Sequence, residues 1–123
     1  MKGTYVLLIE LPKSTKVQVG KLGYIDFQVG FYAYVGSALN GLEARIARHL
    51  REEKKLYWHI DYLLAHARIK EILYAEGSEK GECDIARNLA ARFSSIKGFG
   101  SSDCDCKSHL FYSADKCKLE EHA

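Results

Sequence analysis

The feature that most constrains this chain is a near-continuous apolar run from Tyr5 to Leu11, close to its beginning. A strand with one face in water alternates apolar and polar residues, whereas an unbroken run is typical of a strand buried on both faces. Pro12 and Ser14 end the run. The run therefore predicts a central buried strand over 4–11.

Further strand signals follow along the chain. Residues 17–19 and 24–27 alternate, and Gly20 and Gly23 between them tolerate positive φ, which predicts a β-hairpin. The aromatic and β-branched run 31–35 predicts a strand that stops at Gly36. Later strands are predicted over 68–76 and 110–112.

Three helices are predicted from apolar residues at helical spacing. Leu42, Ile46 and Leu50 recur at i, i+4 and i+8 behind an Asn40 cap, which predicts a helix over 41–54. The same spacing predicts helices over 57–67 and 79–94. Strands come first and helices later, so we expect an α+β fold with a small, mostly antiparallel sheet flanked by helices.

Length and composition narrow the class of protein. A chain of 123 residues predicts one domain over 1–123, and 47% hydrophobic residues suffice for one core. A net charge of +2 argues against disorder and does not by itself identify a partner. No stretch approaches the ~18 apolar residues that span a bilayer, and the four cysteines do not resemble a secreted disulfide framework, so we expect a cytoplasmic protein without a membrane segment.

An ordered set of short motifs runs through the chain. Its members are Gly3-Thr4-Tyr5, Tyr34-Val35-Gly36, Arg45 with His49, and the acidic segment from Glu82 to Ile85; segments 58–63 and 102–110 add a narrower pattern. In this order they resemble the GIY-YIG nuclease superfamily, and more narrowly its small single-domain Uri-like endonucleases. The resemblance covers nearly the whole chain. It implies that the hairpin over 17–27 is an insertion between the two tyrosine motifs, and Tyr32 competes with Tyr34 as the second tyrosine.

The resemblance implies a metal-dependent DNA endonuclease that hydrolyses phosphodiester bonds. Such a reaction needs an activated water and cations that face the charge on phosphorus. Tyr5 would orient or deprotonate the water with help from Tyr34, although an unperturbed Tyr pKa is near ~10. Arg45 and His49, which share one helical face, would stabilise the phosphate. The structural alternative is that the tyrosines are core residues and the arginine is a solvated surface residue.

Glu82 is the metal carboxylate that the resemblance implies, with Glu79 and Asp84 as competing neighbours. One carboxylate suits Mg²⁺ or Mn²⁺, since the former keeps several waters and takes further ligands from phosphate. Without a metal, Glu82 would still be favoured in a first helical turn by the helix dipole.

The first predicted helix also carries the densest basic surface, with Arg48, Arg51, Lys54 and Lys55 as expected DNA contacts. No separate recognition module is evident, so specificity is expected from DNA structure or from a protein partner, and several aromatic residues are compatible with a homodimer.

A zinc site is the remaining alternative for the C-terminal third. Its ligands would be Cys104, Cys106 and His109, with Cys83 or Cys117 as the fourth. The one-residue spacing of the first two is tighter than the usual spacing, which favours thiols packed as small apolar groups. His59 and Asp61 are similarly interpreted first as structural and second as part of a DNA-facing rim.

Three hypotheses of function follow. The first is the metal-dependent endonuclease. The second is a nucleic-acid-binding module of the same fold without turnover, whose binding would be sensitive to salt. The third is a zinc-stabilised interaction domain.

Overall fold

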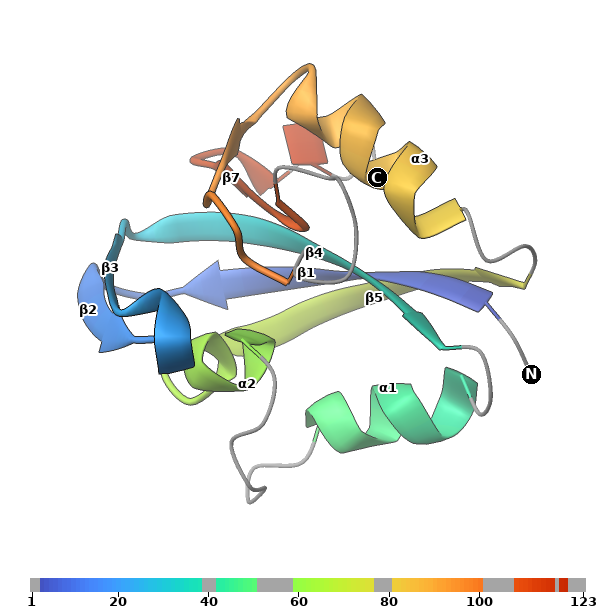
Figure 1. Cartoon of the computed structure of the whole chain (residues 1–123), viewed down its shortest axis with the longest axis horizontal. Coiled ribbons are helices and arrows are strands. Elements are labelled where there is room, and N and C mark those ends of the chain that lie inside the picture. The colour runs from blue at the N-terminus through green and yellow to red at the C-terminus, as the bar shows by residue number, and fades with distance from the viewer. Residues whose placement is uncertain are drawn as a thin grey trace.

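The computed structural model describes most of the chain (Figure 1). The described residues are 3–38, 42–50, 59–76, 81–100, 108–116 and 118–119, and among them the side chains at 37, 38, 42, 43, 75, 76 and 81–83 are not described.

One antiparallel sheet organises the described residues. Its strand order is β5-β1-β4-β7-β6, and every neighbouring pair is antiparallel. The strands are β1 (Gly3–Leu11), β4 (Gly30–Ala38), β5 (Arg68–Glu76), β6 (Ser94–Ser95) and β7 (Leu110–Ser113). The predicted α+β class with an antiparallel sheet is thus confirmed.

β1 lies inside the sheet and is covered on both faces, which explains its unbroken apolar sequence. Successive side chains of a strand point to opposite faces. Tyr5, Leu7 and Ile9 pack into one core with Ile60 and Leu63, and the alternating residues of β1 pack into a second core beyond the sheet. The second core consists of Val6, Leu8, Ala33, Val35, Ala86, Leu89, Phe111 and Leu119.

The helices divide between these two faces (Figure 1). α1 (Leu42–Leu50) and α2 (His59–Leu64) lie on the first face, and α3 (Gly81–Ala90) covers the second. Among the described residues, no helix is long and apolar enough to cross a membrane.

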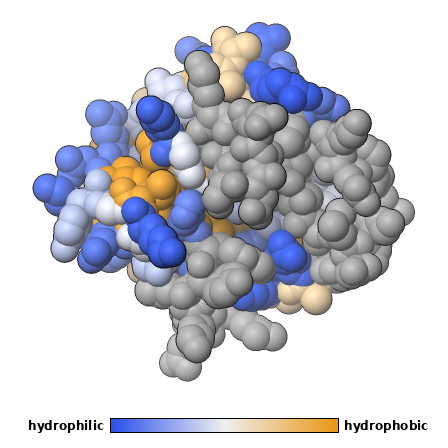
Figure 2. Space-filling model, viewed as in Figure 1, coloured by the Kyte–Doolittle hydropathy of each residue, from blue (hydrophilic) through white to orange (hydrophobic). Residues whose placement is uncertain are grey.

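The predicted hairpin is present and forms a separate two-stranded sheet. It consists of β2 (Thr15–Gln18) and β3 (Tyr24–Phe27), joined through the 3₁₀ turn η1 (Gly20–Leu22). Gly20 and Gly23 both have positive φ, as the sequence predicted. Val17, Val19 and Phe27 anchor the hairpin in the first core, while Leu22 and Tyr24 are exposed. Figure 2 shows an apolar patch among hydrophilic side chains toward this side of the molecule.

Two helix ends differ from the predictions. The helix predicted over 79–94 stops at Ala90, because Ser94 and Ser95 pair with β7 as the edge strand β6. The helix predicted over 57–67 ends at Leu64, since a turn must precede β5. The parts of the predicted helices over 51–58 lie outside the described residues.

Candidate active site

The two tyrosine motifs meet at Gly36. Antiparallel pairing of β1 with β4 places Tyr5 directly opposite Gly36. A Cβ atom on Gly36 would lie 2.4 Å from both Cζ and Oη of Tyr5. Gly36 is not among the described glycines with positive φ, so the requirement is space and not backbone conformation. The glycine of Tyr34-Val35-Gly36 therefore makes room for the Tyr5 ring.

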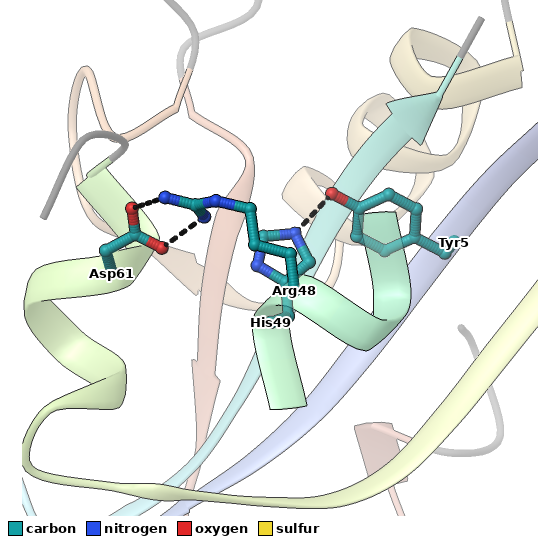
Figure 3. A network of polar contacts seen from close by, with 4 residues as sticks. All are labelled: Tyr5, Arg48, His49 and Asp61. Carbon is teal, nitrogen blue, oxygen red and sulfur yellow. Dashed lines mark hydrogen bonds and ion pairs between the residues drawn. The ribbon is translucent and has the colours of Figure 1, made fainter. Parts of the chain in front are cut away.

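The Tyr5 hydroxyl forms a hydrogen bond with His49 on α1 (Figure 3). The distance from Oη to Nε2 is 2.7 Å, and each residue is 2% exposed. When the imidazole is neutral with its proton on Nδ1, the hydroxyl donates and Nε2 accepts. The structure thus joins two of the residues singled out in the sequence, 44 positions apart, in a geometry suited to proton transfer.

Tyr34 lies beside this pair. Its ring is edge-on to the ring of His49, with centroids 6.3 Å apart, and edge-on to Phe99 at 6.2 Å. It is 9% exposed, more than either Tyr5 or His49. Tyr34 therefore lies next to the Tyr5–His49 hydrogen bond.

Tyr32, the competing second tyrosine, has a different environment. Its hydroxyl donates to the backbone carbonyl of Gln28 at 2.7 Å, and its ring packs against Phe27 and Tyr112. Burial, with a smaller contribution from Tyr112, raises the pKa of Tyr32 far above its usual range. Tyr32 thus has structural partners, whereas Tyr34 is the tyrosine that lies beside His49.

Arg48, a predicted DNA contact, forms an ion pair within the protein. Its guanidinium binds both carboxylate oxygens of Asp61 on α2, at 2.9 and 3.0 Å (Figure 3). The Asp61 side chain is fully buried, whereas the Arg48 side chain is 24% exposed. Its role as a DNA contact stays a prediction, and the bidentate ion pair with a buried carboxylate already holds the guanidinium.

The surroundings of Arg48 raise its pKa. The hydrogen bond with Asp61 is the main cause that raises the pKa of Arg48. Burial opposes this, while the charge of Asp61 and the neighbouring Tyr5 raise the pKa further. Arg45, one turn before His49 on α1, is half-buried.

His59, at the start of α2, connects that helix to the chain around Gly100. The backbone N–H of Gly100 donates to Nδ1 of His59 at 2.9 Å, and the His59 ring is edge-on to Phe99. Burial lowers the pKa of His59. The first interpretation of His59 and Asp61 as structural residues agrees with these contacts, and each residue has its own partner.

Glu82 is on the first turn of α3, the helix on the opposite face from α1. α3 begins toward the end of the sheet where β1 starts (Figure 1). The side chain of Glu82 is not described, and Glu79 lies outside the described residues, so their prediction as metal ligands stays a prediction. The other competitor, Asp84, is largely exposed and forms an ion pair with Arg87.

Most of the remaining predicted DNA contacts and zinc ligands lie outside the described part of the chain. These are Arg51, Lys54, Lys55, Cys104, Cys106 and Cys117, together with the side chain of Cys83. His109 is buried, and its backbone N–H donates to the Phe99 carbonyl at 2.8 Å. Within the described ranges, no three His, Cys, Asp or Glu residues form a group that could hold a metal.

Sequence reasoning missed the partnership of Asp61 with Arg48. A signal was present, because Asp61 and Leu64 are three residues apart and share a helical face that is otherwise apolar. Burying a carboxylate is costly unless a cation pairs with it, so an acidic residue on the buried face of a helix predicts a cationic partner.

Comparison with known proteins places the chain in a family. No curated protein and no solved structure matches it. A family model described as "Domain of unknown function DUF123" matches residues 4–123. Because the match covers nearly the whole chain, this chain belongs to the DUF123 family.

Proposed function

We propose that this protein is a metal-dependent DNA endonuclease. The observation that carries the proposal is the 2.7 Å hydrogen bond between the Tyr5 hydroxyl and Nε2 of His49, beside Tyr34. A hydroxyl held against an imidazole is a suitable pair for moving a proton. The motif order that resembles the GIY-YIG superfamily supports the same reaction, and we propose that the chain is a Uri-like member of it.

In the proposed reaction, water attacks the phosphorus of a phosphodiester. The attacking water gives a proton to the Tyr5 oxygen while the hydroxyl proton of Tyr5 moves to Nε2 of His49. The new bond from the water oxygen to phosphorus forms as the bond to one sugar oxygen breaks, and that oxygen takes a proton from solvent. Tyr34 helps to orient the water, and Arg45 faces the charge that develops on the phosphate.

Glu82 is the residue that would hold a divalent cation. A single carboxylate is a donor set that Mg²⁺ accepts when water and phosphate supply the other ligands. When bound, the cation supplies positive charge for the leaving oxygen. Zinc bound by the cysteines is not needed for this proposal.

Burial of Tyr5 and His49 sets a condition on the reaction. Each side chain is almost wholly covered, so a phosphate can contact the Tyr5 oxygen only after neighbouring groups move. The proposal therefore includes an opening of the site when DNA binds. It also places the reaction in the cytoplasm, where thiols such as those of this chain stay reduced.

Cleavage assays on a panel of DNA structures test the proposal. We expect the purified protein to cut at least one of single-stranded, duplex, flapped or branched DNA with Mg²⁺ or Mn²⁺, and not with EDTA. Glu82→Gln should abolish cleavage while DNA binding survives, since an amide is a poor Mg²⁺ ligand. No cleavage of any substrate with either metal, or an unimpaired Glu82→Gln variant, would contradict the proposal.

Arg45→Ala separates catalysis from binding. Its single-turnover rate should fall on the order of 10²-fold, because the charge is needed most in the transition state. The loss of DNA affinity should be much smaller. Equal losses of rate and affinity would mean that Arg45 is only part of the basic surface.

The second candidate is a nucleic-acid-binding module without turnover, and the burial of Tyr5 and His49 favours it. It predicts salt-sensitive binding that does not require metal. Removing Arg51 should reduce the salt dependence, whereas removing Arg48 should change it little because Asp61 holds that guanidinium.

A further inference from the structure

The Arg48–Asp61 ion pair joins a partly exposed guanidinium to a fully buried carboxylate. Asp61 is fully buried on α2, and Arg48 immediately precedes His49 on α1 (Figure 3). A buried carboxylate stays ionised when a cation binds it closely and satisfies its oxygens. Both oxygens of Asp61 accept a hydrogen bond from Arg48, so the pair meets this requirement.

The Arg48–Asp61 ion pair is linked to Tyr5 through α1. Arg48 and His49 are consecutive residues on α1, and they point to different partners. His49 binds the Tyr5 hydroxyl on β1, while Arg48 reaches α2. Two consecutive residues of α1 thus make the hydrogen bond with Tyr5 and the ion pair with Asp61.

We infer that Asp61 is a positioning residue of the site: by binding both terminal nitrogens of Arg48, it holds that positive charge in place and balances it beside the Tyr5–His49 hydrogen bond. This inference rests on the proposed function for its purpose, because His49 becomes positively charged when it accepts the Tyr5 proton, and an unbalanced Arg48 charge would disfavour that state. The charge balance itself is a property of the folded protein without DNA.

The groups around His49 define what a change at Asp61 would do. They are Tyr5 from β1, Tyr34 from β4, Arg45 and Arg48 from α1 itself, and Asp61 from α2 through Arg48. Removing the negative charge of Asp61 would leave the charge of Arg48 without its balance. A nearby like charge disfavours the protonated imidazole, so the pKa of His49 should fall.

The test is an NMR titration of the histidine side chains in the protein without DNA. The chain has five histidines, and His49→Asn identifies the signals of His49. Asp61→Asn, which keeps the size of the side chain, should lower the pKa of His49 by about half a pH unit or more. The double variant Asp61→Asn with Arg48→Gln removes both charges and should return the pKa toward that of the parent protein.

The double variant distinguishes charge balance from a purely structural role. If Asp61 acts only by holding α1 and α2 together, the double variant should perturb His49 at least as much as Asp61→Asn alone. Asp84→Asn is the matched control, because Asp84 pairs with Arg87 on the exposed surface of α3. It should leave the pKa of His49 unchanged.

The outcomes also separate this inference from the nuclease proposal. A lowered pKa in Asp61→Asn that the double variant restores supports the inference, whether or not the protein cuts DNA. An unchanged pKa in Asp61→Asn, or a double variant as far from the parent as the single variant, would overturn it. If cleavage is found, its acidic pH limit should move in the same direction as the pKa of His49.

Discussion

Gly36 is the residue at which the two tyrosine motifs depend on each other. Gly36→Ala should destabilise the protein by about 1–3 kcal/mol, because the new methyl group would overlap the Tyr5 ring and force a shift in a packed core. Urea denaturation measures the free energy of unfolding. In a Tyr5→Val background the added methyl should cost much less, and an equal cost in both backgrounds would mean that the ring is not the cause.

The sequence identified the residues of the site better than their partners. Tyr5, Tyr34 and His49 were selected from their motifs, and the structure brings them together. The choice between Tyr32 and Tyr34 was beyond the sequence, since alternation puts both on the same face of β4. Their partners separate the two, since the Tyr32 hydroxyl donates to the Gln28 carbonyl and the Tyr34 ring lies edge-on to His49.

At the scale of elements, the buried ion pair joins α1 to α2. Asp61→Ala should cost about 1.5–3 kcal/mol of unfolding free energy, because it removes the charged hydrogen bonds by which Arg48 joins the two helices. The exposed pair on α3 is the natural comparison. Asp84→Ala should cost less than about 1 kcal/mol. Similar losses in urea denaturation of the two variants would show that the pair between the helices does not anchor them.

His59 makes the attachment of α2 sensitive to pH. Because burial lowers its pKa in the folded state, the unfolded chain takes up a proton first as the pH falls through the ordinary value near ~6.5. The contribution of His59 to the free energy of unfolding is therefore fully present above that pH and declines below it. Protonation of Nδ1 would also break the hydrogen bond from Gly100.

Urea denaturation at pH 7.5 and pH 5.5 checks this expectation. The parent protein should lose more stability between the two pH values than His59→Gln, whose side-chain carbonyl still accepts a hydrogen bond but does not titrate in this range. An equal loss in both proteins would mean that His59 does not carry the effect.

The elements were predicted well where the local pattern decides, and less well where tertiary pairing decides. The long alternating or apolar segments gave β1, β4 and β5, and the glycines gave the β2–β3 hairpin. The edge strand β6 was missed, since two serines have no strand pattern and pair only because β7 is adjacent. Its presence also shortened the predicted third helix.

For the whole molecule, the α+β class followed from the order of the elements, whereas the strand order did not. β5 joins the sheet beside β1, and β7 joins beside β4 although the two are far apart in the sequence. Such long-range pairing has no local signal. The β2–β3 hairpin, which lies between β1 and β4 in the sequence, does have a local signal. Because it forms a separate sheet, the two distant tyrosine motifs can still occupy neighbouring strands.

We propose that the Tyr5 hydroxyl takes part in DNA cleavage, and a pair of matched variants tests this claim. Tyr5→Phe and Tyr32→Phe each remove one buried hydroxyl from the same face of the sheet and keep the ring. Their losses of stability should therefore be similar, about 0.5–1.5 kcal/mol for one hydrogen bond. They differ only in whether the lost hydroxyl binds His49 or a backbone carbonyl.

The deciding measurement is the single-turnover rate of metal-dependent DNA cleavage by these two variants, with DNA affinity measured alongside. We predict that Tyr5→Phe cleaves on the order of 10²-fold more slowly or worse at unchanged affinity, as expected for loss of a general acid–base group, while Tyr32→Phe keeps the parental rate. Equal rates for Tyr5→Phe and Tyr32→Phe would contradict the claim.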